Sequence, residues 1–466
     1  MSIRQAYWRV RESLARFADV WSVRLQDCAA QIAFLGRFWW RTRRHRSQPA
    51  EGQIGDRSIL IVSYYFPPYR SVYGTQRISK FAKFLSRRGW NITVLSTTPE
   101  PDQIIDDQEI ERESIAIVRL PQATIRSDLK NRGMFVPDDY FQWESVAAET
   151  AVRLIKEKQI SLVLSTAPPY TNLVVGTLAA RKTGLPHIVD FRDPWSRIDF
   201  AWVIRSPILV RANRWMERMV LQLADRIVSV VDAQYLESFL GDDSVEVREK
   251  TRVITNGFDD EDFSFPEMQW ESRDKFVVSY VGSIYDRETF DNILGALEAW
   301  KRRHPEDLNR VKFSYAGGGS HYLTSVGNFP CEIIDSGYVS HRSAVELRRH
   351  SHLQIFSQPR SFAKFVYSGK IFEMIRTGPP ILAFTHIDGA VAQLLGRAQA
   401  GIAVAPGAME DGAIALKSYF DRWLSGEPLV SADLGVISQY SRSALSATLE
   451  RECQELISEP MTRSAG

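Results

Sequence analysis

The chain has 466 residues, of which 44% are hydrophobic and 24% charged, a composition typical of globular proteins with large buried cores. It excludes disordered, collagen-like and disulfide-stapled miniprotein classes. The net charge of +2 conceals an asymmetry, because residues 1–50 hold ten arginines, no lysine and three acids, a net +7, whereas the other 416 residues hold 48 basic and 53 acidic residues, a net −5.

Residues 1–50 are predicted to form a long amphipathic helix and a linker. Apolar residues recur there at steps of three or four, which places them on one helical face: Val10, Leu14, Phe17, Trp21, Leu25, Cys28, Ile32, Leu35 and Trp39. Indole rings favour the headgroup level of a bilayer and arginine pairs with anionic phosphates, so one hypothesis is a helix lying on a membrane surface through residues 1–46. The alternatives are packing on the body or on a second subunit, and a targeting peptide or nucleic-acid arm.

From residue 58 the pattern changes to short apolar runs separated by helical stretches. Residues 58–63 predict a buried strand, and residues 75–88 an amphipathic helix that Gly89 ends. Further strands are expected at 92–95, 115–120, 162–165, 188–191, 227–231 and 253–255. Strands alternating with helices predict βαβ units and a parallel sheet.

The pattern restarts at residue 276. A strand at 276–281 runs into Gly282, a helix is expected at 289–302, and a strand at 311–316 ends in three consecutive glycines. Later strands are expected at 353–357, 380–384 and 402–404. The sequence thus predicts an α/β protein of two doubly wound, Rossmann-like parallel-sheet domains facing a cleft, with ligands outside the carboxyl ends of the strands.

The cysteines and the longest uncharged stretch indicate in which cellular compartment the protein is expected. Cys28, Cys331 and Cys453 are odd in number and far apart, which favours a reduced, intracellular protein with no disulfide framework and no Cys-x-x-Cys metal site. Polar and proline residues at 165–172 interrupt the uncharged stretch 160–180, so it predicts strand, loop and helix instead of a transmembrane span.

The first motif lies at the turn after the first strand. Tyr-Tyr-Phe-Pro-Pro at 64–68 leads to Gly74 and Arg77. A turn glycine lets backbone N–H groups approach an anion at a helix N-terminus, and an arginine adds a fork of donors for phosphate. A purely structural turn glycine is the alternative. The turn is not a G-x-G-x-x-G fingerprint, and the chain has no Walker A sequence.

The second motif, Asp190-Phe-Arg-Asp-Pro194, follows a predicted buried strand. Two carboxylates and Arg192 crowd the carboxyl end of that strand, where charged residues face a ligand cleft. The alternative is a structural Asp–Arg pair beside a helix cap, with Asp193 as N-cap and Pro194 as the first helical residue.

The third motif begins at Gly369. Lys370 at a helix start is suited to binding phosphate, and Glu373 one turn later to accepting protons from sugar or ribose hydroxyls. As an isolated pair three residues apart, the two would only support a surface helix.

Together these motifs resemble the bacterial family-4-like glycosyltransferases of GT-B fold, over roughly residues 58–425. Further motifs of the resemblance are Ser165–Pro169, Ile254–Asp259 and Tyr280–Ser283. The resemblance implies an acceptor domain at 51–265 and a nucleotide-sugar donor domain at 266–425. Residues 426–466 are expected to form C-terminal helices that pack back on the N-terminal domain.

The family resemblance implies transfer of a sugar from a nucleotide-sugar donor with retention of configuration. It implies catalytic roles for Asp193 and Glu373 and places Asp190 and Arg192 on the acceptor side. The donor would be bound by Gly74, Arg77, Ser283, Arg287, Lys370 and Glu373. Arg287 and Lys370 would neutralise the leaving diphosphate, so no metal or cofactor is expected beside the nucleotide-sugar co-substrate. The acidic doublets at 106–107, 138–139 and 259–260 are interpreted as loops or caps.

The sequence departs from the family pattern at three places. Phe365 stands where the first of the family's paired glutamates would fall, eight positions before Glu373. Ser283 stands where an arginine is common, and Arg287 only approximates a usual lysine. Asp193 occupies the neighbourhood where many relatives carry an acceptor-side histidine; His187 is the alternative there, although the start of a strand favours a core or surface role.

The leading hypothesis is a hexosyltransferase acting on a lipid-linked or cell-surface polysaccharide acceptor. It would be cytoplasmic and peripheral on the inner face of the cytoplasmic membrane, with an anionic membrane surface but no nucleic acid among its partners. Two alternatives are a non-catalytic GT-B-like scaffold or nucleotide-binding partner subunit, and a nucleotide-sugar epimerase.

Overall fold

The computed structural model divides into two compact units, Met1–Ile254 with Ser446–Gly466, and Thr255–Leu445. The sequence had placed the domain boundary between residues 265 and 266. The residues described are 26–43, 46–47, 57–69, 75–103, 113–122, 135–196, 207–242, 244–264, 274–284, 286–360, 364–429 and 432–458.

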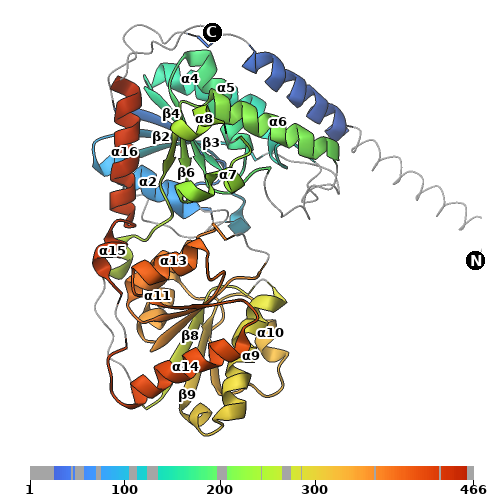
Figure 1. The fold of residues 1–466 in the computed structure, drawn as a ribbon. Helices are drawn as coiled ribbons and strands as arrows, with labels where there is room; N and C mark the ends of the chain where they lie inside the picture. Colours follow the sequence, from blue (N-terminus) through green and yellow to red (C-terminus); the bar gives the residue numbers. More distant parts are fainter. Residues whose placement is uncertain are drawn as a thin grey trace, which may run out of the picture. The chain divides into compact units, whose positions relative to one another are not determined.

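The first unit contains a seven-stranded parallel sheet of order β3-β2-β1-β4-β5-β6-β7 (Figure 1). Its strands are β1 Ser58–Val62, β2 Asn91–Thr97, β3 Ile115–Leu120, β4 Leu162–Ala167, β5 His187–Phe191, β6 Arg226–Ser229 and β7 Thr251–Val253. Every residue of β1, β4, β5 and β6 is buried, as in a parallel sheet covered by helices on both faces.

Seven helices around this sheet have both ends within the described part of the chain: α2 Thr75–Arg87, α4 Glu144–Glu157, α5 Thr171–Thr183, α6 Pro207–Leu223, α7 Leu236–Phe239, α8 Val245–Glu249 and α16 Arg442–Ser458. From Ser446 onward, α16 belongs to the first unit. Glu450 of this helix accepts hydrogen bonds from Arg88 and from the indole of Trp90, which ties the C-terminal helix to the loop after α2.

The second unit contains a six-stranded parallel sheet of order β10-β9-β8-β11-β12-β13. Its strands are β8 Phe276–Val281, β9 Val311–Ala316, β10 Glu332–Asp335, β11 Leu353–Ser357, β12 Ile381–Phe384 and β13 Gly401–Val404. Its helices are α9 Arg287–Arg303, α10 Ser320–Thr324, α11 His341–Arg349, α12 Lys370–Thr377, α13 Ala390–Arg397, α14 Met409–Leu424 and α15 Leu434–Ser438. The sequence had not predicted β10, an edge strand.

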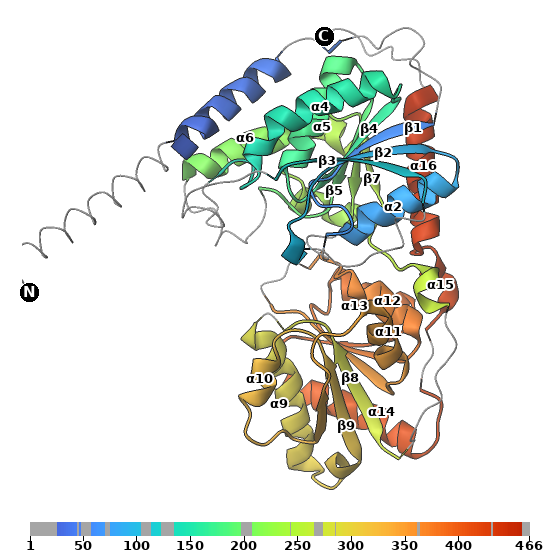
Figure 2. The same ribbon diagram turned by 180° about the vertical axis from the view of Figure 1, so that it is seen from behind.

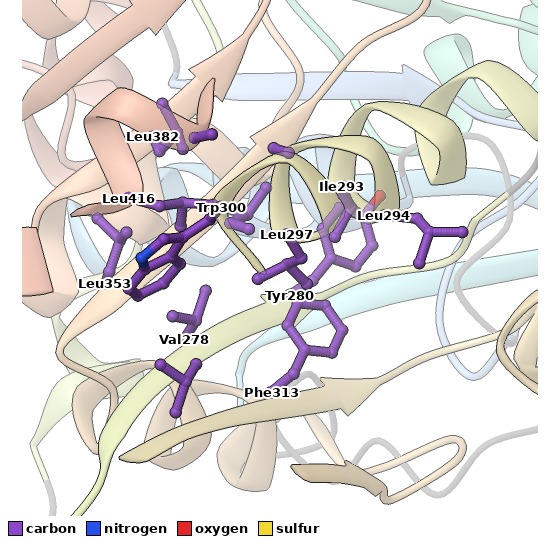
Figure 3. Packing of buried hydrophobic residues seen from close by; sticks show 14 of the residues in the cluster. Val278, Tyr280, Ile293, Leu294, Leu297, Trp300, Phe313, Leu353, Leu382 and Leu416 are labelled. Carbon is purple, nitrogen blue, oxygen red and sulfur yellow. The ribbon is translucent and has the colours of Figure 1, made fainter. Parts of the chain in front are cut away.

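The core of the second unit lies between its sheet and the helices α9 and α14 (Figure 3). Trp300 of α9 is buried there, packs edge-on against Phe420 at 5.3 Å, and donates its indole N–H to Asp307. The two helices approach closely at Gly295, where an added Cβ would lie 2.5 Å from Cγ of Met409. A larger residue at this position would require the Met409 side chain to shift.

A helix at residues 26–42 packs on the first unit beside α6 (Figures 1 and 2). Its buried side consists of Asp27, Gln31, Phe34, Phe38 and Thr42. The predicted apolar face lies one residue away from this stripe, so Cys28, Ile32 and Trp39 are exposed and Leu35 is half-buried. Residues 1–25, which carry the rest of that predicted face, lie outside the described residues.

Contacts of this helix show why the inner stripe is buried. Phe34 packs edge-on against Phe141 at 5.7 Å, and Phe38 against Trp215 at 5.6 Å. Arg41 pairs at 2.9 Å with the carboxylate of Glu144, whose side chain is 1% exposed. Packing on the body, one of the alternatives from the sequence, therefore holds for the described part of the helix.

Candidate functional site

Asp190, at the carboxyl end of β5, forms a buried ion pair with Arg77 of α2. Nη2 of Arg77 lies 2.9 Å from Oδ1 of Asp190, and the arginine is 1% exposed. Arg77 also donates to the carbonyl of Ile254 at 2.7 Å, and Thr166 donates to the other Asp190 oxygen. This is a structural Asp–Arg pair, formed with Arg77 and not with the neighbouring Arg192; the ligand-binding roles of Arg77 and Asp190 stay predictions.

Arg192 and Asp193 lie at the same end of β5. Arg192 donates to the carbonyls of Ala167 and Pro168 at 2.8 and 2.7 Å, and burial lowers the pKa of its guanidinium. Asp193 is exposed to solvent, directly after Arg192. Residues 194–196 are not helical, so the alternative of a helix cap at Asp193 is wrong.

His187 occupies the core of the first unit. Its Nε2 lies 2.7 Å from Oγ of Ser165, and burial lowers its pKa to about 3. An added Cβ at Gly176 would lie 2.6 Å from the same nitrogen, so α5 covers the ring closely. His187 has the core role expected of it, and the acceptor-side alternative does not fit this burial.

In the second unit, the turn after β8 and the turn after β9 lie in direct backbone contact. Gly317 has φ +152°, and an added Cβ there would lie 2.2 Å from the carbonyl oxygen of Gly282. Ile284 N–H donates to the carbonyl of Gly318, and the Gly318 N–H donates to Oγ of Ser283 at 3.3 Å. The glycines predicted at these strand ends thus allow a close approach that side chains would block.

Lys370 reaches the carboxyl end of β8 from the start of α12. Its Nζ lies 3.2 Å from the position that a Cβ at Gly282 would take, and 3.4 Å from the hydroxyl of Tyr280. It also lies over the rings of Tyr280 and Phe356, at 4.7 and 5.2 Å from their centroids. Desolvation, together with the charge of Arg348, lowers the pKa of the ammonium group to about 7. The predicted phosphate-binding lysine therefore lies beside the glycine turn.

Glu373 is held by Arg348 of α11, a residue that the sequence analysis missed. Nη1 of Arg348 lies 3.0 Å from Oε2 of Glu373, and its Nη2 donates to the carbonyl of Val281. His341, at the start of α11, contacts Asp262 at 3.2 Å, and this hydrogen bond raises the pKa of its imidazole. Basic and acidic groups thus line one end of this sheet.

The other predicted site residues are placed differently. Arg287 is exposed on α9, where it pairs with Asp291 at 2.7 Å. Phe365 is buried and can supply no polar contact to a sugar. Gly74 lies outside the described residues. The structure thus brings Ser283, Lys370 and Glu373 to one end of the second sheet, and Arg77, Asp190, Arg192 and Asp193 to one end of the first.

Two of the acidic doublets act as caps, as predicted. Asp138 accepts hydrogen bonds from the backbone and hydroxyl of Thr171 at the start of α5, and Asp259 caps the short helix that follows it. The doublet at 106–107 lies outside the described residues. Within the part of the chain that the structure describes, there is no group of three or more acidic, histidine or cysteine residues that could hold a metal, and no helix long and apolar enough to span a membrane.

Residues 74–257 match the family described as glycosyl transferase 4-like domain. The resemblance predicted from the sequence motifs is thereby confirmed. The comparison with curated proteins found no match.

Solved structures share the architecture of both units. HepE of Anabaena in complex with UDP-glucose is 15% identical, with coverage of 85% of this chain and 99% of its own and a TM-score of 0.56. The α,α-trehalose-phosphate synthase (UDP-forming) of Burkholderia vietnamiensis is 13% identical, with 86% and 99% covered and a TM-score of 0.56. The lipopolysaccharide outer core galactosyltransferase WaaB is 12% identical, with 85% and 99% covered and a TM-score of 0.53. These similarities confirm the predicted GT-B-type fold of two Rossmann-like domains, and the family match supports sugar transfer.

Proposed function

We propose that this glycosyltransferase moves a hexose, with retention of configuration, from a nucleotide-sugar to a lipid-linked or cell-surface saccharide. The observation that carries the proposal is the position of Lys370. Its ammonium group lies beside the backbone of Gly282, the residue that follows β8. A diphosphate needs positive charge close to its oxygens, and Gly282, which has no Cβ, lets such a ligand come close to Lys370.

The chemistry follows from where charge develops. As the sugar leaves, negative charge grows on the departing diphosphate, and a preplaced cation lowers the barrier without reorganisation. Lys370 would supply that cation, so the mechanism does not depend on a metal. Glu373, oriented by Arg348, would accept hydrogen bonds from sugar or ribose hydroxyls. Asp193, which is exposed just beyond the carboxyl end of β5, would act on the acceptor side.

One observation favours a second candidate, a non-catalytic nucleotide-binding protein. Phe365 is buried at the position where the family carries its first paired glutamate, so one donor-sugar contact has no carboxylate at this position. Such a protein would bind a nucleotide without turnover. The two candidates differ in one measurable quantity, the release of nucleotide from a nucleotide-sugar.

The experiment has two steps. A thermal-shift screen against UDP, GDP, ADP, CMP and dTDP identifies the nucleotide, because a ligand that binds only the folded state raises the melting temperature. Nucleotide release from the matching nucleotide-sugars is then measured with and without saccharide acceptors. We expect Lys370→Ala to reduce release at least about tenfold. Lys364→Ala, at a surface lysine paired with Asp388, is the control and should keep the wild-type rate.

Donor-dependent release that needs an acceptor supports the transferase. Turnover of the nucleotide-sugar to an isomer without any acceptor would indicate an epimerase instead. Nucleotide binding without any release would support the non-catalytic candidate.

The exposed face of helix 26–42 supports a peripheral position on the cytoplasmic face of an anionic membrane. Its inner stripe packs on the body, whereas Ile32, Trp39 and Trp40 are 72%, 46% and 52% exposed. Arg43 lies over the Trp39 ring at 4.3 Å, which places a cation beside the indole. Exposed indoles next to arginine suit the headgroup region of anionic lipid.

A further inference from the structure

Four tyrosines gather beyond the carboxyl end of β1, and the proposed mechanism uses none of them. Tyr64, Tyr65 and Tyr69 follow β1, and Tyr140 precedes α4. Tyr140 lies 4.6 Å from Tyr64 and 5.8 Å from Tyr65 between ring centroids, and Tyr65 lies 5.0 Å from Tyr69. We call Tyr65 and Tyr140 the tyrosine pair.

Burial divides the cluster into two layers. Tyr64 and Tyr69 are buried, and the Tyr69 hydroxyl is 2.6 Å from Oγ1 of Thr97, with burial raising its pKa. The tyrosine pair is half-buried, its rings meet at 84°, and the Tyr65 hydroxyl donates to the Tyr140 hydroxyl at 2.7 Å. The outer layer therefore keeps part of its surface in contact with solvent.

The segment that carries Tyr140 is fixed from both sides. The Tyr140 N–H donates to Asp138 at 3.0 Å, and Asp138 in turn accepts from the Thr171 N–H at the start of α5. On the other side, the Gln31 side chain donates to the carbonyl of Val136 and accepts from its N–H at 2.9 Å. Tyr140 is thus held before any ligand arrives, which lowers the entropic cost of binding.

We propose that the tyrosine pair binds a hexopyranoside ring of the acceptor, a subsite that deepens and rests on the proposed function. The C–H face of a pyranose packs on an aromatic ring, while phenol hydroxyls both donate to and accept from sugar hydroxyls. The pair also lies on the side of the sheet where we expect the acceptor. The strands β1, β4 and β5 are neighbours (Figure 2), so their carboxyl ends lie together on that side. Asp190 and Asp193 stand at the end of β5.

The test measures sugar binding by the full chain without any donor. Methyl α-D-glucopyranoside, galactopyranoside and mannopyranoside are titrated to tens of millimolar in saturation-transfer difference NMR. We expect ring-proton signals for at least one sugar. The double variant Tyr65→Phe/Tyr140→Phe keeps every ring contact and removes both hydroxyls, so it should fold normally and bind that sugar about fivefold more weakly.

Tyr69→Phe is the matched control, because it makes the same change in the same cluster at a hydroxyl buried against Thr97. It should lower stability but leave sugar binding unchanged. Equal weakening in the control and the double variant would show a structural role and overturn the proposal. So would the absence of signal for all three sugars in the wild-type chain.

Failure of this subsite and failure of the proposed function give different results. A chain that releases nucleotide from a nucleotide-sugar but binds no hexopyranoside retains the transferase proposal without the subsite. A chain that binds the sugar through the tyrosine pair but shows no donor turnover retains the subsite without the transferase proposal.

Discussion

The side-chain amide of Gln31 hydrogen-bonds to both backbone groups of Val136, at 2.6 Å to the carbonyl and 2.9 Å from the N–H. This reproduces, with one side chain, the two-bond pairing of a β-ladder. Both Val136 groups are in a buried segment. The helix at 26–42 is therefore part of the folded body of the first unit.

We expect Gln31→Ala to destabilise the first unit by about 1–3 kcal/mol, because it leaves a buried N–H and a buried carbonyl without partners. Urea unfolding followed by tryptophan fluorescence measures the change. Gln26→Ala, at an exposed position of the same helix, is the control and should change stability by less than about 0.5 kcal/mol. Equal effects of the two variants would contradict the pairing.

The buried pair of Arg77 and Asp190 makes a second stability prediction. Asp190→Ala leaves an uncompensated guanidinium in the core, and we expect a loss of about 3–5 kcal/mol in the free energy of unfolding. Arg87→Ala removes an exposed pair with Glu113 from the same helix and should cost at most about 1 kcal/mol. A small effect of Asp190→Ala would show that this pair is not desolvated as the structure indicates.

The sequence predicted most of the fold because its signals are local. A run such as residues 59–62 is apolar throughout, which a buried strand explains well. The edge strand Glu332–Asp335 was missed, since it is short and mostly exposed and so lacks that signal. The packed side of helix 26–42 was also missed: Gln31 and Phe34 find their partners more than a hundred residues away, at Val136 and Phe141.

The candidate site shows the same limit. Lys370 and Glu373 were found because they are close in the sequence and follow a glycine. Arg348, which orients Glu373, was not found, because their contact exists only through the packing of α11 beside α12. The Arg77–Asp190 pair joins residues 113 positions apart, so the sequence could indicate each residue but not the contact between them.

His187 predicts how stability changes with pH. Its folded pKa of about 3 lies below the ordinary 6.5, so the unfolded chain takes up the proton first as the pH falls. The contribution of His187 to the free energy of unfolding is constant above pH 6.5. Between pH 6.5 and 3 the free energy of unfolding declines by up to about 1.4 kcal/mol per pH unit. We expect the double variant His187→Leu/Ser165→Ala, which removes both partners, to flatten this slope in urea unfolding.

His321→Leu, at an exposed histidine, is the control for that measurement and should keep the wild-type slope. If the double variant keeps the wild-type slope instead, the pH dependence arises elsewhere in the chain.

Lys370 predicts how nucleotide affinity changes with pH. With a pKa of about 7, the free ammonium group is half protonated at neutral pH, and the charged form binds a diphosphate better. We expect the affinity for the preferred nucleoside diphosphate to fall about tenfold between pH 7 and 8.5 in calorimetric titrations. Lys370→Arg keeps its charge over this range and should show a flat profile. A flat profile in the wild type would contradict the assignment of Lys370 to the phosphate.

The exposed face of helix 26–42 predicts membrane binding that is separable from folding. Trp39 and Trp40 lie outside the packed stripe, so Trp39→Gln/Trp40→Gln should leave the melting temperature nearly unchanged. The loss of two indoles should weaken binding to phosphatidylglycerol vesicles at least about tenfold in flotation assays. Ile414→Gln/Leu424→Gln, which removes two exposed apolar side chains from α14, is the matched control and should bind as the wild type does. Equal binding by all three proteins would show that this face does not dock on lipid.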